Sequence, residues 1–253
     1  MELTPLAIGG LFVVALLAGI VDAIAGGGGL LTVPALLSTS LPTTFVFGTN
    51  KGSAVFGSGA SLWRFWRANL VDRKRAPLLF PVAFAGSLCG ALAVTWMDPK
   101  QLRPVVLVLL VLAGLIVAFA RPPEASPGQV AANATLKGAL LALIIGSYDG
   151  FFGPGTGTFL IIGFVWLLHL TPQEASANAK VVNFASNLAA MLLFAFKGLI
   201  VWRVSLPMAA GQFIGGVIGA HLAVKQGDAL VKKMVLVVVV LLVMKLASDL
   251  LNA

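Results

Sequence analysis

The feature that most constrains the fold of this chain is a glycine-rich break in an apolar run, which occurs twice. The first copy begins at Asp22 and runs through four consecutive glycines to Gly29. The second begins at Asp149, 127 positions later, and ends at Gly157. Each copy is followed by another apolar run of only about a dozen residues. Inside a helix each glycine costs roughly 1 kcal/mol relative to alanine, so the sequence predicts a helix break at both places.

The composition places these apolar runs in a membrane. Hydrophobic residues make up 59% of the 253 positions, charged residues 10%, and the mean hydropathy is +1.01. Charged residues are roughly a quarter of an ordinary soluble domain, and several runs here reach the ~18 to 20 residues that cross a bilayer as a helix. The sequence therefore predicts an all-α, polytopic transmembrane helical bundle with membrane lipid around it.

The net charge of +8 does not indicate a nucleic-acid partner, because the basic residues lie in short loops between apolar runs. Such loops anchor the cytoplasmic side of membrane proteins, so we assign the basic cluster at residues 64–75 to the cytoplasm. The single cysteine, Cys89, excludes an intrachain disulfide and a cysteine metal cluster. It lies in an apolar run and is expected to be a buried packing residue.

The runs predict about eight full transmembrane helices, plus short broken or re-entrant helices after the two glycine-rich loops. Residues 1–120 are interpreted as a first transmembrane repeat, 121–133 as a proline-rich linker, and 134–253 as a second repeat homologous to the first. Lys51 matches Lys180 at an offset of 129. The predicted apolar segments are 4–25, 30–40, 45–66, 77–97, 102–120, 134–149, 158–170, 174–196, 204–223 and 230–251.

The number of crossings in each repeat stays open at this point. If the short run after the glycines dips in and returns, or continues a broken helix, each repeat crosses four times and the copies are parallel. If it crosses fully, five crossings make the copies inverted. The distribution of Lys and Arg among the loops fits both arrangements.

Four charged residues lie inside or at the edge of the apolar runs: Asp22, Lys51, Asp149 and Lys180. An unpaired charge there costs at least ~2.5 to 3.5 kcal/mol. Two interpretations compete. In the first, each Asp pairs with a Lys as an internal strut, or the aspartates lie at the membrane interface. In the second, the four residues form a substrate or proton site between the two repeats.

The glycine breaks favour the second interpretation. A half-helix that starts after such a break presents free backbone N–H groups and the positive end of its dipole inside the membrane, which favours an anion. The residues expected to contact this anion through the break are Gly28, Gly29, Gly155, Thr156 and Gly157. Four other glycines, Gly86, Gly90, Gly215 and Gly219, have the small-xxx-small spacing of close helix packing instead.

Further hydrogen-bonding groups lie around the two lysines and complete the predicted site. Thr49 and Asn50 precede Lys51, while Asn183 and Asn187 follow Lys180 on one helical face. These groups are interpreted as part of a substrate cavity, with helix–helix hydrogen bonding as the alternative. No catalytic triad, metal-binding cluster or nucleotide-binding motif occurs, so we expect no enzyme activity, no metal and no cofactor.

At these positions the chain resembles the sulfite exporter TauE/SafE family of bacterial inner-membrane permeases. The resemblance rests on residues 21–29 with 48–51, and on residues 149–157 with 177–183. It implies export or uptake of small sulfur-containing anions, such as sulfite or organosulfonates, across the cytoplasmic membrane. Asp22 and Asp149 would then neutralise the lysines in the empty site or carry protons that couple transport to the membrane gradient.

Three functions follow as hypotheses from these features. The first is a secondary transporter of a small anion, the second is a passive anion channel, and the third is a membrane-embedded enzyme with paired aspartates. Transport by a coupled carrier is preferred, since no nucleophile or metal accompanies the aspartates. The substrate, the direction of transport, the coupling ion and a homo-oligomeric state are left open.

Overall fold

The computed structural model describes residues 3–98 and 133–251, and in this part of the chain helices joined by short loops are the only regular secondary structure. The predicted span 102–120 and nearly all of the predicted linker lie outside the described residues. The all-α fold class is confirmed for the rest. The helices are α1 (Pro5–Ala25), α2 (Gly29–Leu37), α3 (Thr43–Arg67), α4 (Ala76–Trp96), α6 (Ala134–Phe151), α7 (Thr156–Leu168), α8 (Pro172–Phe196) and α9 (Trp202–Leu251).

The helix ends follow from local sequence. Thr4 caps α1 by accepting a hydrogen bond from the N–H of Ala7, and Thr171 and Glu174 form a reciprocal capping box at the start of α8. Gly26 ends α1 with a left-handed backbone, φ +77°, which glycine adopts without steric cost. Within α9, Gly227 has φ +66° and divides the helix into two arms, as the separate runs 204–223 and 230–251 predict.

Four of the described helices are both long and apolar enough to cross a membrane: α1, α4, α8 and the first part of α9. Helices α3 and α6 are 25 and 18 residues long but carry polar and charged residues. Helices α2 and α7, with 9 and 13 residues, are shorter than the ~20 residues that a span needs. The prediction of two short helices after the glycine breaks is confirmed, while the number of about eight full spans stays a prediction.

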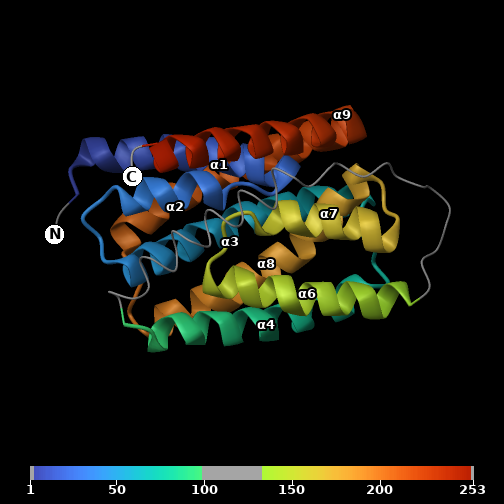
Figure 1. Cartoon of the computed structure of the whole chain (residues 1–253), viewed down its shortest axis with the longest axis horizontal. Coiled ribbons are helices and arrows are strands. Elements are labelled where there is room, and N and C mark those ends of the chain that lie inside the picture. The colour runs from blue at the N-terminus through green and yellow to red at the C-terminus, as the bar shows by residue number, and fades with distance from the viewer. Residues whose placement is uncertain (1–2, 99–132, 252–253) are drawn as a thin grey trace.

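The most extensive contacts between helices join helices on opposite sides of residues 99–132. Helix α1 packs along α9, and α6 packs along α4, while α3 and α8 contact each other and lie against α9 and α4 respectively (Figure 1). The small-residue prediction is confirmed at these contacts. A Cβ atom on Gly90 would lie 2.0 Å from the Ser147 carbonyl oxygen of α6, and one on Gly215 would lie 2.1 Å from the Leu16 carbonyl oxygen of α1.

The contacts of the glycines on α4 recur for the glycines on α9, at the sequence offsets found above. Gly86 and Gly90 meet Leu143 and Ser147, whereas Gly215 and Gly219 meet Leu16 and Ile20. In Figure 1, α1 and α6 run in opposite directions, and so do α3 and α8. Of the two arrangements that the sequence leaves open, these directions agree with inverted copies.

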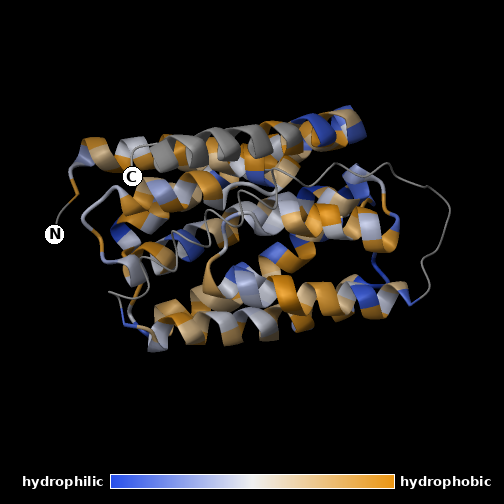
Figure 2. Cartoon of the chain, viewed as in Figure 1, coloured by the Kyte–Doolittle hydropathy of each residue, from blue (hydrophilic) through white to orange (hydrophobic). Residues whose placement is uncertain are grey.

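Large apolar side chains are exposed along several helices of the bundle, as expected for contact with lipid. Leu136, Leu140 and Ile144 follow one another on the exposed face of α6, and Figure 2 shows hydrophobic colouring along much of α4 and α6. Cys89 on α4 is also exposed, so the expectation of a buried packing residue is wrong. An apolar run in a membrane helix has no required inward face, because lipid accepts the same side chains as the core.

Candidate functional site

The two glycine-rich breaks meet at the centre of the molecule. A Cβ atom on Gly26 would lie 2.2 Å from the carbonyl carbon of Gly157, so the two backbones touch and neither position has room for a side chain. The hydroxyl of Thr158 on α7 also donates a hydrogen bond of 2.8 Å to the carbonyl oxygen of Ala25 at the end of α1. The ends of the two broken helices are therefore joined to each other.

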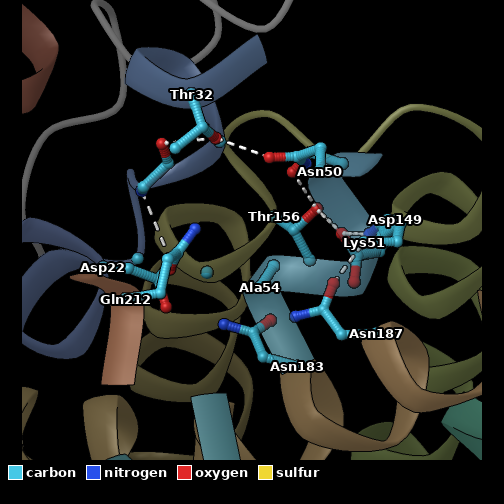
Figure 3. A pocket seen from close by; sticks show the side chains of 15 residues that line it. Asp22, Thr32, Asn50, Lys51, Ala54, Asp149, Thr156, Asn183, Asn187 and Gln212 are labelled. Carbon is cyan, nitrogen blue, oxygen red and sulfur yellow. Dashed lines mark hydrogen bonds and ion pairs between the residues drawn. The ribbon is translucent and has the colours of Figure 1, made fainter. Parts of the chain in front are cut away.

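A polar pocket lies beside this junction and holds about 400 Å³ of empty space, its open mouth included. Figure 3 shows side chains from both broken regions and from α3, α8 and α9 directed around it. The pocket is lined by Asp22, Gly26, Gly28, Gly29, Thr32, Asn50, Lys51, Ala54, Asp149, Gly153, Thr156, Gly157, Asn183, Asn187 and Gln212.

One wall of the pocket contains a buried ion pair between α3 and α6. The Lys51 ammonium donates to Asp149 Oδ1 at 2.8 Å and to Asn187 Oδ1 at 2.9 Å. Asp149 also accepts hydrogen bonds from the hydroxyls of Thr156 and Ser186. Both charged side chains are 5% exposed or less, so the pair satisfies the requirement that buried charges be partnered.

A second ion pair joins α8 to the end of α1. The Lys180 ammonium donates to Asp22 Oδ2 at 2.9 Å and to the Asp22 backbone carbonyl oxygen. Asp22 Oδ1 accepts the N–H of Gly28 at 3.4 Å, which holds the start of α2 against α1. Each lysine is thus paired with the aspartate from the other side of residues 99–132, and the two pairs are related by the offsets that relate the sequence copies.

The structure brings most of the predicted site residues to the pocket but not all of them. Asp22, Asp149, Lys51, Asn50, Asn183, Asn187, Gly28, Gly29, Thr156 and Gly157 line it. Lys180 does not line it, because its ammonium is covered by Asp22. Thr49 points to another interface, where its Oγ1 accepts the N–H of Val201 at 3.1 Å. Gly155 does not line the pocket either; its left-handed backbone, φ +85°, precedes α7.

The sequence patterns did not identify two polar residues of the pocket. Gln212 lies in the predicted apolar segment 204–223, where a polar side chain could have indicated a site residue. Thr32 lies on α2, where its hydroxyl donates to Asn50 Oδ1 at 2.6 Å and to the Gly28 carbonyl oxygen at 3.2 Å. Because residues four apart share one face of a helix, Thr32 lies on the same side of α2 as Gly28.

Asn183 is the unusual member of the pocket. Asn183 is 4% exposed. Its Oδ1 is nevertheless the one buried side-chain oxygen or nitrogen that lacks a hydrogen-bond partner among the described residues. A buried polar atom without a partner costs about 1 to 3 kcal/mol. A residue in a pocket with such an atom is suited to contact a bound molecule or water.

The charges of the pocket region balance when it is empty. Two ammonium groups and two carboxylates cancel, while the N-termini of α2 and α7 add partial positive charge on the pocket side. The amides of Asn50, Asn187 and Gln212 supply further hydrogen-bonding groups at the same walls. The arrangement provides hydrogen-bond donors and a positive potential for a small anion without a permanent uncompensated charge in the membrane.

A helical bundle with a polar pocket where two broken helices meet is the architecture of a membrane transporter. The family model for the sulfite exporter TauE/SafE matches residues 11–246, so the chain belongs to this family. It is accordingly a multi-pass membrane protein, and the resemblance found in the sequence is confirmed.

Several curated relatives carry the name of probable membrane transporter protein. ORF9 of Sinorhizobium sp is 36% identical over 241 residues, covering 94% of this chain and 92% of its own. YfcA of Escherichia coli strain K12 is 36% identical over 250 residues, with 97% and 91% covered. A Haemophilus influenzae relative is 36% identical over 239 residues, with 94% of each chain covered. No solved structure matches the chain.

Proposed function

We propose that this protein is a secondary transporter that moves a small anion across the cytoplasmic membrane. The proposed substrate is a sulfur-containing anion such as sulfite or an organosulfonate. Its two homologous repeats, residues 1–120 and 134–253, would contribute equivalent elements to one site between them. The recurrence of the lysine–aspartate pairs at the repeat offsets supports this division.

The observation that carries the proposal is the meeting of two helix N-termini with Lys51 in one pocket. Gly28 and Gly29 at the start of α2, and Thr156 and Gly157 at the start of α7, all line it. Backbone N–H groups at helix starts have no intrahelical partners and favour negatively charged ligands. Sulfite and organosulfonates share a sulfur atom that bears several acceptor oxygens, which suits donors arriving from several directions.

Uptake into liposomes tests this function directly. Purified protein is reconstituted with an imposed pH gradient, and sulfite, thiosulfate, sulfoacetate, taurine and chloride are offered in separate experiments. We expect one sulfur-containing anion to accumulate, and Lys51→Ala to abolish this uptake, because the substitution removes the ammonium that lines the pocket. The variant must still insert into the membrane and elute as a single species from a sizing column.

The same experiment separates the competing functions. Equilibration of all anions without accumulation identifies a passive channel. Chemical conversion of a substrate in detergent, without any vesicle compartment, identifies an enzyme. Failure of every sulfur anion to move contradicts the proposed substrate class.

A further inference from the structure

The two pocket aspartates have the same sequence context but unlike surroundings. Asp149 accepts hydrogen bonds from the Lys51 ammonium and from the hydroxyls of Thr156 and Ser186, so both of its oxygens are occupied. Its side chain is 5% exposed. Three donors therefore occupy three of the roughly four acceptor sites of this carboxylate.

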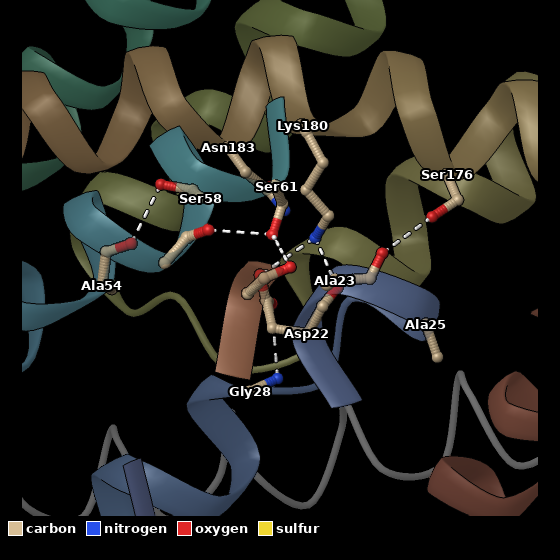
Figure 4. A network of polar contacts seen from close by, with 12 residues as sticks. Asp22, Ala23, Ala25, Gly28, Ala54, Ser58, Ser61, Ser176, Lys180 and Asn183 are labelled. Carbon is tan, nitrogen blue, oxygen red and sulfur yellow. Dashed lines mark hydrogen bonds and ion pairs between the residues drawn. The ribbon is translucent and has the colours of Figure 1, made fainter. Parts of the chain in front are cut away.

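Asp22 is held more loosely and is open to the pocket. Its carboxylate accepts one ammonium hydrogen bond from Lys180 and one long bond from the Gly28 N–H. Its side chain is 19% exposed, while that of Lys180 is fully buried (Figure 4). Lys180 also donates to the Asp22 backbone carbonyl oxygen, so the ammonium keeps an acceptor when the carboxylate changes its charge.

The charged groups that face Asp22 are few. Helix α8 contributes Lys180, and the pocket brings Lys51 of α3 and Asp149 of α6 to the same cavity. Helices α2 and α7 contain no ionisable residue. From α9 the pocket residue is the neutral Gln212, and the charged residues of that helix do not line the cavity. The Asp22 carboxylate is therefore balanced mainly by Lys180.

From this asymmetry we infer that Asp22 alone binds the proton that drives transport, while Asp149 stays ionised and holds the pocket together. The inference rests on the proposed function as an anion transporter. The step moves one proton from water to an Asp22 oxygen, which gives a neutral carboxylic acid and leaves Lys180 as an ammonium without a counter-charge.

Proton uptake and anion binding then favour each other. With Asp22 neutral, the region holds two ammonium groups and one carboxylate, and a net positive charge inside a membrane protein is costly unless an anion offsets it. By linkage, a bound anion makes protonation of Asp22 more favourable by the same factor. With Asp22 protonated, an anion of charge −1 leaves the region neutral and an anion of charge −2 leaves it at −1. Without the proton, the same anions leave the region at −1 and −2.

Comparison of Asp22→Asn with Asp149→Asn tests the inference in the liposome assay. The probe is labelled thiosulfate or sulfoacetate, whichever the wild-type protein takes up. Two rates are measured: accumulation driven by a pH gradient, and exchange of labelled for unlabelled anion without a gradient. We expect Asp22→Asn to lose accumulation completely while its exchange rate stays within about threefold of wild type, since asparagine mimics the protonated carboxyl.

Asp149→Asn is expected to lose both rates, because one carboxylate acceptor of three donors is replaced by an amide. Asp22→Glu should restore accumulation, since it returns a group that binds a proton. Asp72→Asn is the matched control for an Asp-to-Asn change outside the pocket, in the loop between α3 and α4, and should behave as wild type. All variants are compared by elution profile and thermal unfolding.

Each remaining outcome overturns the inference in a distinguishable way. Normal accumulation by Asp22→Asn shows that Asp22 does not bind the coupling proton. If Asp149→Asn alone keeps exchange but loses accumulation, the coupling proton binds to Asp149 instead. Loss of both rates by Asp22→Asn in a folded protein makes Asp22 a binding residue only. Wild-type exchange without accumulation removes the coupling proton but leaves an anion transporter, whereas no anion movement at all contradicts the proposed function itself.

Discussion

Asn183 and Asn178 lie on the same helix, α8, and differ in what their amides do. Asn178 accepts the N–H of Asp72 and donates to the carbonyl oxygens of Leu70 and Glu174. Asn183 has a buried oxygen without a partner and faces the pocket. At the scale of single residues, this difference separates a structural asparagine from one that is available to a substrate.

We expect Asn183→Leu to leave the free energy of unfolding within about 1 kcal/mol of wild type or to raise it, because it removes an unsatisfied polar atom. Anion binding should weaken about tenfold or more, as befits a lost hydrogen bond to a charged group. Thermal unfolding in detergent and binding by calorimetry measure the two effects.

Asn178→Leu is the matched comparison on the same helix. It should lower the free energy of unfolding by about 1 to 3 kcal/mol, because the backbone groups of Leu70, Asp72 and Glu174 each lose a hydrogen bond to the Asn178 amide. If Asn183→Leu is the more destabilising of the two, the amide of Asn183 has a structural role and our assignment of it to the substrate is wrong.

The sequence was informative about residue types and less so about partners. A charge in an apolar run is costly wherever it lies, so Asp22 and Lys180 could be singled out without a structure. Their pairing across the molecule depends on how distant helices pack, which no local pattern encodes. Thr49 and Thr32 show the same limit, because the rotation of each helix about its axis decides which threonine reaches the pocket.

At the scale of helices, contact between α4 and α6 depends on the absence of a side chain at Gly90. A Cβ atom there would overlap the carbonyl oxygen of Ser147 and approach the N–H of Phe151 at 2.8 Å. We expect Gly90→Ala to lower the free energy of unfolding by about 1 to 3 kcal/mol, as overpacking does in other tightly packed cores. Thermal unfolding in detergent measures the change.

Gly10 on α1 is the control for this substitution, since a Cβ atom there has nothing within 4 Å. Gly10→Ala should be neutral or stabilise the protein by up to about 1 kcal/mol through helix propensity. Equal effects of the two substitutions would show that propensity, rather than the close approach of α4 and α6, determines the outcome.

The helices were predicted well where a break or a spacing marks them. The glycine-rich segments fixed the ends of α1 and the starts of α2 and α7 to within a few residues, because glycine there disfavours a continuous helix. The direction of α2 after the break was not predictable, since it depends on contacts such as that between Gly28 and Asp22. The helices that pack against the glycines of α4 and α9 could not be predicted either, because any helix can offer a backbone carbonyl oxygen.

At the scale of the whole molecule, the two sides of residues 99–132 are interleaved. Expression of residues 1–120 and 121–253 as separate chains should therefore yield a complex only when both are made together. We expect an affinity tag on one fragment to retain the other through detergent extraction, and either fragment alone to elute as aggregate. A sharp, thermally stable monomer of residues 1–120 alone would contradict this expectation.

The interleaving has a consequence for the order of events at the ribosome. Helix α1 is synthesised before its packing partner α9, and the other described helices lie between them in the sequence. Until α8 and α9 have been synthesised, Asp22 lacks its partner Lys180, and α1 lacks the glycines of α9 that pack against it. The Asp22 charge and the broken end of α1 are then exposed to lipid or water. We therefore expect membrane insertion of this chain to depend on an environment that shields α1 until α8 and α9 have been synthesised.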